Sequence, residues 1–277
     1  MGPEIKKTLV LSLPIVVGQL GQMLMSVVDN IMVGKVGAQA LAAASIANSL
    51  FLLIMVVGFG LTVAVTPLTA IAYGAGRDEE CGIVLRQGIL LNLFSGILLC
   101  AITLLLSECI QFLNQPEEIV GPASLYMKVL GFSMLPLMLF QSYRQFAEGV
   151  SFLKPAMIIT LLANLVNILA NWIFIYGNLG VTPLGLTGAG IATISSRTFM
   201  AIALMIIIRK SSKMQRFDPT LNYRKIDLPM MRRLLAIGIP AGFQYFFEVS
   251  AFAASAIMIG WMGTIALAAH QIALNLA

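Results

Sequence analysis

The chain has 277 residues, of which 59% are hydrophobic and only 10% are charged, and its formal net charge is +5. This composition excludes a soluble globular domain, because the surface of such a domain needs more charge. The positive charge lies between long apolar segments, so it indicates membrane topology and not nucleic-acid binding.

Apolar runs long enough to cross a bilayer recur from one end of the chain to the other. A membrane-spanning helix needs about 20 apolar residues, and these runs do not alternate as the strands of a β-barrel do. The sequence therefore predicts an all-α polytopic membrane protein with seven full spans and the opening of an eighth. The predicted spans are 8–33, 43–72, 83–106, 124–146, 155–176, 184–208 and 234–259, and the eighth begins near Ala266.

The connections divide this chain into three parts. A six-helix N-terminal lobe is predicted at 1–208, a basic linker at 209–233 and the start of a C-terminal lobe at 234–277. The shorter connections are expected to be turns at 34–37 and 74–80, a polar loop at 107–122 and a Gly/Pro loop at 178–183.

Lysine and arginine gather in alternate connections, and this pattern predicts the orientation. Most basic residues precede the first span or follow the second, fourth and sixth, whereas the opposite side carries only Lys35 and Lys128. The positive-inside rule therefore places the N-terminus in the cytoplasm. Arg197 lies inside the sixth predicted span, where the rule does not explain it; it could face the bundle, pair with an acid on another helix or snorkel toward water.

An internal repeat relates the first and seventh spans. With a shift of 226 residues, 31–50 aligns with 257–276 at eleven identical positions of twenty, and Pro14 aligns with Pro240. Six spans separate the two copies, so both run in the same direction, as in transporters built from parallel repeats. Such a plan needs about twelve spans, so we expect this chain to be part of a longer protein.

Two acidic residues lie within predicted spans, where a charge costs about 2.5 kcal/mol or more. Asp29 is in the outer half of the first span, and Glu248 is near the middle of the seventh. Loss of water favours the neutral form of each carboxyl group, so both are candidates to bind H⁺, with Na⁺ as the alternative ion. The alternatives to an ion site are a water-exposed helix end for Asp29 and a structural hydrogen bond for Glu248.

The fifth span carries Asn164, Asn167 and Asn171, whose spacing places them on one stripe of a helix. Asn171 and Asp29 lie at similar distances from the outer ends of their spans, so they are expected to face one cavity. Amide oxygens bind hard cations and accept hydrogen bonds from a protonated acid. The sequence thus predicts an H⁺ or Na⁺ site at Asp29, Asn167 and Asn171, or at Glu248; interhelical packing is the alternative for the asparagines.

Proline residues interrupt the hydrogen bonding of several predicted spans. Pro14 and Pro240 lie in the first and seventh spans, and Pro67 and Pro136 lie in the second and fourth. Each is expected to permit a kink. A bend close to Asp29 or Glu248 would couple ion binding to helix shape, whereas ordinary structural kinks are the alternative.

The sequence contains no motif that would indicate an enzyme. H-E-x-x-H, Walker A and G-x-S-x-G patterns are absent, which argues against a membrane protease or an ATP-driven pump. The three cysteines lack metal-ligand spacing and are expected to be free thiols, so no cofactor is expected.

These residues together resemble the MATE (multidrug and toxic compound extrusion) family, in particular its NorM-like bacterial branch. The resemblance covers the whole chain and is carried by LPIVVGQLGQMLMSVVDNIMVG (13–34), RQFAEGVSFLKP (144–155), the Asn167/Asn171 pair, LGLTGAGIAT (184–193), GIPAGFQYFFEV (238–249) and GTIALAAHQIALN (263–275).

The resemblance implies twelve helices in two six-helix lobes and the export of organic cations in exchange for H⁺ or Na⁺. It also implies that Asp29, Asn167 and Asn171 are the family's site in the first lobe, that Pro14 is its kinked proline and that Glu248 marks the NorM-like branch. Some relatives carry aspartate where this chain has Asn171, which leaves the ion and the stoichiometry open. The acidic partner of Glu248 would lie beyond residue 277.

We therefore expect a cation-coupled antiporter that exports small cationic drugs by alternating access. It would lie in the bacterial plasma (inner) membrane, be monomeric at full length, and bind no cofactor or nucleic acid. The nearest alternative is a lipid or oligosaccharide flippase of related architecture. A flippase would need a larger and more cationic cavity, and few basic residues besides Arg197 lie within spans. An ion channel is a more distant alternative, because no filter-like run is present.

Overall fold

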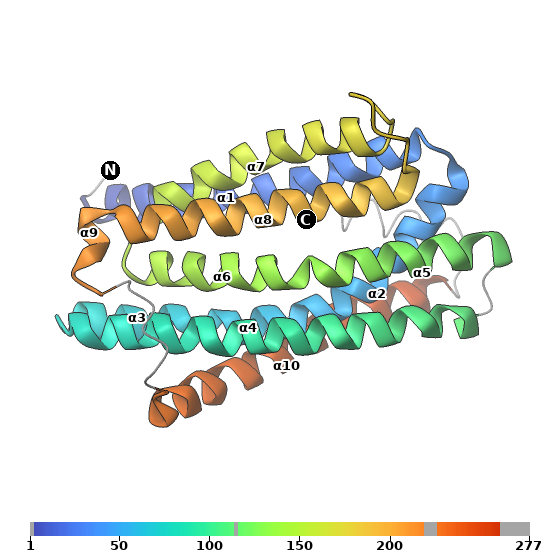
Figure 1. Ribbon diagram of the computed structural model, residues 1–277. Coiled ribbons are helices and arrows are strands. Elements are labelled where there is room, and N and C mark those ends of the chain that lie inside the picture. The colour runs from blue at the N-terminus through green and yellow to red at the C-terminus, as the bar shows by residue number, and fades with distance from the viewer. Residues whose placement is uncertain (1–2, 114–115, 219–225, 261–277) are drawn as a thin grey trace.

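The computed structural model describes residues 3–113, 116–218 and 226–260, and within these ranges every regular element is a helix (Figure 1). The eighth predicted span and most of the second copy of the repeat lie outside the described residues. In chain order the elements are α1 (Pro3–Gly34), α2 (Ala38–Val63), α3 (Val65–Gly74), α4 (Asp78–Cys109), the short 3-10 helix η1 (Ile110–Leu113), α5 (Glu117–Phe132), α6 (Met134–Gly149), α7 (Leu153–Phe174), α8 (Gly185–Lys210), α9 (Ser212–Gln215) and α10 (Leu228–Gly260).

Seven segments of the described chain are long and apolar enough to cross a membrane, as the sequence predicted. Their mean hydropathies lie between 1.3 and 2.5. They are Ser12–Gly34, Ala38–Gly74, Asp78–Phe112, Glu117–Gly149, Leu153–Phe174, Gly185–Lys210 and Leu228–Ala251. In an apolar solvent a helix is the form in which each span satisfies its own backbone groups, and for this reason the long apolar runs fold in this way.

Two predicted connections are shorter in the structure than expected. The polar loop predicted at 107–122 is wrong, because α4 and η1 continue to Leu113 and α5 begins at Glu117. The acidic residues in the first turn of α5 favour this start, since they face the positive end of the helix dipole. The basic linker also shortens: α8 continues through Lys210, and α10 begins at Leu228, where Asp227 accepts a hydrogen bond from the Met230 amide at 2.8 Å.

The second and fourth spans are each broken into two helices ahead of a proline. The break between α2 and α3 is at Ala64, and that between α5 and α6 is at Ser133, in each case three residues before Pro67 or Pro136. Proline removes one helix hydrogen bond and crowds the preceding turn, which explains the interruptions. Ala64 and Ser133 keep helical backbone angles, so a bend at Pro67 or Pro136 stays a prediction. In contrast, α1 and α10 continue as single helices through Pro14 and Pro240, and a bend at either remains a prediction.

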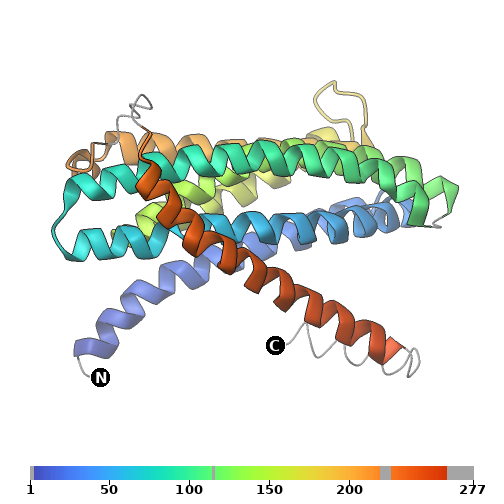
Figure 2. The same ribbon diagram turned by 90° about the horizontal axis from the view of Figure 1, so that it is seen from below.

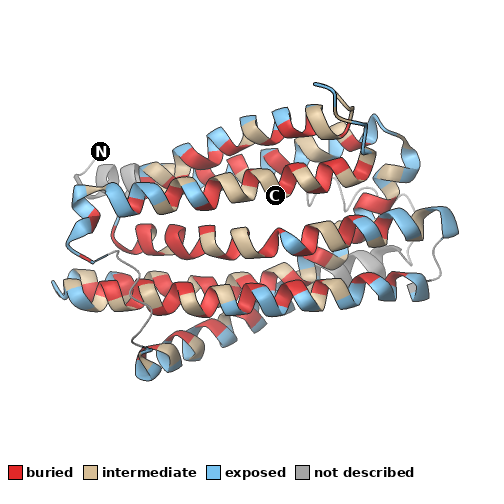
Figure 3. Ribbon diagram, viewed as in Figure 1, coloured by how far each residue is buried: buried red, intermediate tan, exposed pale blue. Residues whose placement is uncertain are grey.

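The helices form an elongated bundle with a buried cluster near each end. α7 packs between α1 and α8, whereas α4 packs against α5 and α6 (Figure 1). One cluster includes Phe140, Phe146 and Leu204, and the other includes Phe51, Tyr126 and Met134. Exposed residues occur along the outer sides of the helices (Figure 3). Many of them are large and apolar, as lipid-facing positions require.

α10 crosses the rest of the bundle diagonally and contacts it mainly through α2 (Figure 2). The closest approach is between two glycines: a Cβ placed on Gly60 would lie 2.1 Å from the Gly242 Cα. No side chain fits there, so the backbones pack directly, as in glycine-mediated helix pairs of membrane proteins. Beyond this crossing α10 exposes apolar side chains, with Phe243 60% and Phe247 66% exposed.

Candidate functional site

Asp29 lies near the C-terminal end of α1 at a junction with two other helices. The Asn171 side-chain amide of α7 donates a hydrogen bond to Asp29 Oδ1 at 2.5 Å, and the Thr193 hydroxyl of α8 lies 3.5 Å from Oδ2. No Lys or Arg nitrogen among the described residues lies within 4.0 Å of this carboxylate. A half-buried acid held by neutral donors is therefore available to a cation.

The three asparagines of α7 make two kinds of contact. Asn171 also donates to Asn167 Oδ1 at 3.2 Å, and both side chains are fully buried beside Asp29. Asn164 instead donates to the carbonyls of Gly21 and Thr160, each at 2.9 Å, and so joins α7 to α1. The structure thus brings Asp29, Asn167 and Asn171 together, whereas Asn164 serves helix packing.

The oxygen atoms at this junction match the ligand preferences of a hard cation. The Asn171 Oδ1 atom is buried and has no hydrogen-bond partner among the described residues, and Asn167 Oδ1 and the Thr193 hydroxyl lie close by. Carboxylate, amide and hydroxyl oxygens are the groups that bind such ions, and the same carboxylate can take a proton. The donor set therefore fits Na⁺ or H⁺, and its use for either remains a prediction.

A cavity of about 300 Å³ opens beside Asp29. Its walls combine flexible and aromatic apolar side chains with a few polar ones. The apolar set includes Met25, Met55, Met200, Phe51 and Phe59, and the polar set includes Gln22, Asn48, Asp29, Thr193 and Arg197. Methionine-rich walls adapt to ligands of different shape, as binding sites with broad specificity require.

Arg197 lies on the same face of α8 as Thr193, one helical turn further along. Its guanidinium donates to the Ser133 hydroxyl at the break between α5 and α6 and lies 5.3 Å from the centre of the Phe51 ring. The sequence analysis left Arg197 without a role and missed Thr193. The four-residue spacing of a hydroxyl and a charge within one span was the signal that pointed to a shared face.

Glu248 does not join this site in the structure. It lies exposed on α10, beyond the crossing with α2, and is not among the residues that line the cavity. Pro240 lies on the same helix, on the other side of the crossing glycine Gly242. The prediction of an ion site at Glu248 therefore has no described partner residue to support it.

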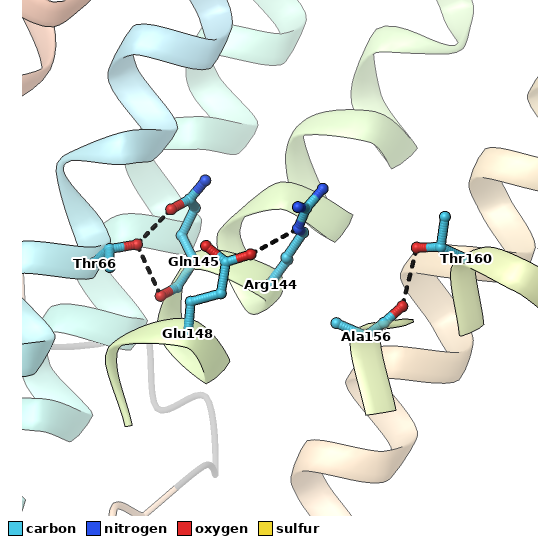
Figure 4. A network of polar contacts seen from close by, with 6 residues as sticks. All are labelled: Thr66, Arg144, Gln145, Glu148, Ala156 and Thr160. Atoms are coloured by element: carbon cyan, nitrogen blue, oxygen red, sulfur yellow. Dashed lines mark hydrogen bonds and ion pairs between the residues drawn. The ribbon is translucent and has the colours of Figure 1, made fainter. Parts of the chain in front are cut away.

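A second polar cluster lies at the opposite end of the bundle (Figure 4). Arg144 and Glu148 form an ion pair at 2.8 Å on α6, with side chains 6% and 17% exposed. Thr66 of α3 donates to the Gln145 carbonyl at 3.0 Å and also contacts the Gln145 side chain. The ion pair and Pro14 line one very small cavity, so this cluster serves to pack α1, α3 and α6.

Comparison with known proteins identifies the same fold and similar sequences. The MatE family model matches residues 14–173. The chain is 34% identical over 272 residues to multidrug resistance protein NorM of Vibrio cholerae and 33% identical over 273 residues to multidrug resistance protein MdtK of Yersinia pestis. Each alignment covers 98% of this chain and 60% of the relative, so the chain spans about 60% of the length of these curated relatives.

Solved structures agree with the sequence matches. A eukaryotic MATE transporter, AtDTX14, superposes with a TM-score of 0.82 over 93% of this chain and 56% of its own, at 21% identity. At this identity the likeness shows the fold alone. It shows that the helices are arranged here as they are in part of that structure.

Proposed function

We propose, from the premise that this chain belongs to the MatE family, that the protein exports small organic cations from the cell in exchange for H⁺ or Na⁺. The family consists of transporters and not enzymes, and the chain is a multi-pass membrane protein. The observation that carries the proposal is the Asp29 carboxylate, held by Asn171 at 2.5 Å in the wall of a 300 Å³ cavity between spanning helices.

Competition at one carboxylate would couple the two movements. When Asp29 is ionised it attracts a positively charged drug into the apolar cavity, where little water screens the charges. When H⁺ or Na⁺ occupies the carboxylate and its neighbouring amide oxygens, that attraction is lost and the drug leaves. The carboxylate cannot serve both cations at once, so ion entry would be linked to drug exit.

Alternating access would supply the route across the membrane, and the ion gradient would set its direction. Two lobes that rock about a central site would expose the cavity first to one side of the membrane and then to the other. Ion and drug can shift this equilibrium only as far as each binds one state more tightly than the other. Glu248, on α10, is proposed as a second ion-binding acid.

The cavity favours drug export over the flippase alternative. A lipid or oligosaccharide flippase must hold phosphate groups, and a site for several phosphates needs several basic side chains. Among the residues that line the cavity, Arg197 is the one basic side chain, and it is opposed by Asp29. The names of the similar Vibrio and Yersinia proteins, which are multidrug resistance proteins, also favour drugs as the substrates.

The test is a pair of charge-removing substitutions in the complete protein. Asp29→Asn keeps the size of the side chain and one acceptor oxygen but removes its charge, and we expect ethidium export to fall about tenfold or more, because interactions with a charged group contribute about 1.5–3 kcal/mol. Glu79→Gln is the matched control, since Glu79 is exposed at the start of α4. Unchanged ethidium export in cells that carry both Asp29→Asn and Glu248→Gln would refute the proposal.

A further inference from the structure

Arg197 is a cation placed within a membrane-spanning helix; Asp29 attracts it electrostatically but forms no ion pair with it. Its helix, α8, runs from Gly185 to Lys210, so Arg197 lies near the middle of the span. Within the described residues no carboxylate oxygen lies within 4.0 Å of its guanidinium. Its contacts are one hydroxyl, that of Ser133, and the face of Phe51.

These contacts leave most of the binding capacity of the guanidinium unused. Arginine presents five N–H donors in a planar fork that matches a carboxylate with two parallel hydrogen bonds. One hydrogen bond to a neutral hydroxyl and one aromatic contact satisfy only part of this fork. A charge at this depth is costly, and residues that retain one there commonly belong to a functional site.

The position of Arg197 in the cavity shows which ligand could use the remaining donors. Arg197 and Asp29 line the same cavity, yet they are too far apart to form an ion pair of their own. The other lining residues are apolar side chains, among them Met200 and Met25, and polar ones such as Thr193. The cavity therefore offers one anionic group, one cationic group and apolar wall, in about 300 Å³, a volume at the lower end of the range typical of small-molecule sites.

We propose that Arg197 binds the acidic group of amphoteric substrates, so that a molecule carrying both an amine and a carboxylate lies with its amine toward Asp29 and its carboxylate at Arg197. This inference rests on the proposed export function and defines a substrate class within it. A purely cationic compound would use the Asp29 end alone and leave the Arg197 fork without a partner.

A pair of fluorescent dyes that differ only at the acidic group tests this assignment. Rhodamine 110 has a free carboxylate and is zwitterionic, and rhodamine 123 is its methyl ester and is cationic. Their binding to the purified complete protein can be followed by fluorescence anisotropy. We expect Arg197→Gln to weaken binding of rhodamine 110 relative to rhodamine 123 by about tenfold or more, because the variant loses charge-assisted hydrogen bonds.

The ratio of the two affinities makes the result independent of folding, since a poorly folded fraction lowers binding of both dyes alike. Arg197→Lys keeps the charge but not the planar fork, and we expect an intermediate ratio. Arg209→Gln is the matched control, because Arg209 lies exposed at the end of the same helix, and its ratio should equal that of the unchanged protein.

Two results would overturn the inference. Equal weakening of both dyes by Arg197→Gln would mean that Arg197 acts on the cavity as a whole, for example as a distant counter-charge to Asp29. Binding of rhodamine 123 but not rhodamine 110 by the unchanged protein would mean that acidic groups are rejected. In either case ethidium export by the unchanged protein would leave the proposed function standing, whereas absence of ethidium export would contradict both.

Discussion

At the scale of single residues, the proposed ion exchange depends on how Asp29 is held. Its carboxylate accepts one short hydrogen bond from Asn171, and Asn171 is itself fixed by Asn167. This arrangement orients the carboxylate toward the cavity without neutralising it, as an ion-exchange site requires. A basic partner in the same place would hold the carboxylate permanently and remove its capacity to exchange ligands.

Substitutions of two asparagines on α7 can distinguish the positioning of Asp29 from the packing of α7 against α1. Asn171→Ala removes a hydrogen bond to a charged group, and we expect ethidium export to fall about tenfold or more, for a loss of about 1.5–3 kcal/mol at the site. Asn164→Ala removes the links to Gly21 and Thr160, so its main effect should be on stability. Export and thermal unfolding of both variants of the complete protein give the comparison, and a larger loss of export for Asn164→Ala would contradict the assignment.

The sequence was sufficient to identify the acid and its amide neighbours, but not the rest of the site. Asp29 and the asparagines are conspicuous because polar groups are rare within apolar spans. Thr193 and Arg197 reach the same point from α8, and a single sequence does not specify how three helices rotate against one another. Conversely, Glu248 is conspicuous in the sequence, yet it lies exposed and does not line the cavity.

At the scale of helices, the contact between α2 and α10 is the most demanding in its packing. Gly60 and Gly242 lie so close that a Cβ on Gly60 would overlap the α10 backbone at 2.1 Å. The two helices belong to different copies of the internal repeat, so in the division predicted from the sequence this crossing would join the first lobe to the start of the second.

A single added methyl group tests the importance of this crossing. We expect Gly60→Ala to force the two helices apart and to lower the stability of the complete protein by about 1–3 kcal/mol, the usual cost of overpacking. Gly121→Ala is the control, because a Cβ on Gly121 of α5 meets no atom within 4 Å. Thermal unfolding in detergent measures both, and equal stabilities would show that α10 does not pack on α2 in the complete protein.

The sequence predicted helices well where a long apolar run indicated a membrane span. It predicted them poorly where a helix continues through polar residues beyond such a run. The seven spans were found because nothing else accommodates long apolar runs in a bilayer. The loop predicted at 107–122 was wrong because polarity was taken as a sign of a loop, whereas α4 continues through Ser107 and Cys109 beyond the apolar run. Prolines proved informative in the spans containing Pro67 and Pro136, where the helix breaks three residues earlier.

At the scale of the whole molecule, successive spans cross the membrane in opposite directions. Once one helix end is placed on one side of the membrane, the sides of all other helix ends follow. α4 has 32 residues and is therefore about 48 Å long, more than the roughly 30 Å of the hydrocarbon core. Cys109, at its end, is exposed, whereas Cys81, in its first turns, is buried. With the N-terminus in the cytoplasm, Cys109 would face the outside of the cell.

Labelling of cysteine tests this orientation directly. We expect a membrane-impermeant maleimide to label Cys109 of the complete protein in intact cells, and Cys109→Ser to remove that labelling. Labelling of Cys109 only in everted vesicles would reverse the proposed orientation. The buried Cys81 and Cys100 should stay unlabelled from either side until the protein is unfolded.

The internal repeat gives the first lobe its place in the exchange mechanism. α10 begins the second copy of the repeat, so two similar lobes are expected to enclose a central site, with Asp29 in the wall of the first. Since an ion can drive transport only by binding one arrangement of the lobes more tightly than the other, the coupling must be visible as a dependence of drug movement on the ion gradient.

The most direct test is drug efflux by the complete protein in proteoliposomes, with a proton gradient and a Na⁺ gradient imposed separately. The account predicts that at least one gradient drives ethidium against its own concentration gradient, and that Asp29→Asn abolishes this uphill movement. Uphill ethidium transport that persists in Asp29→Asn, or that needs neither gradient, would contradict exchange at this carboxylate.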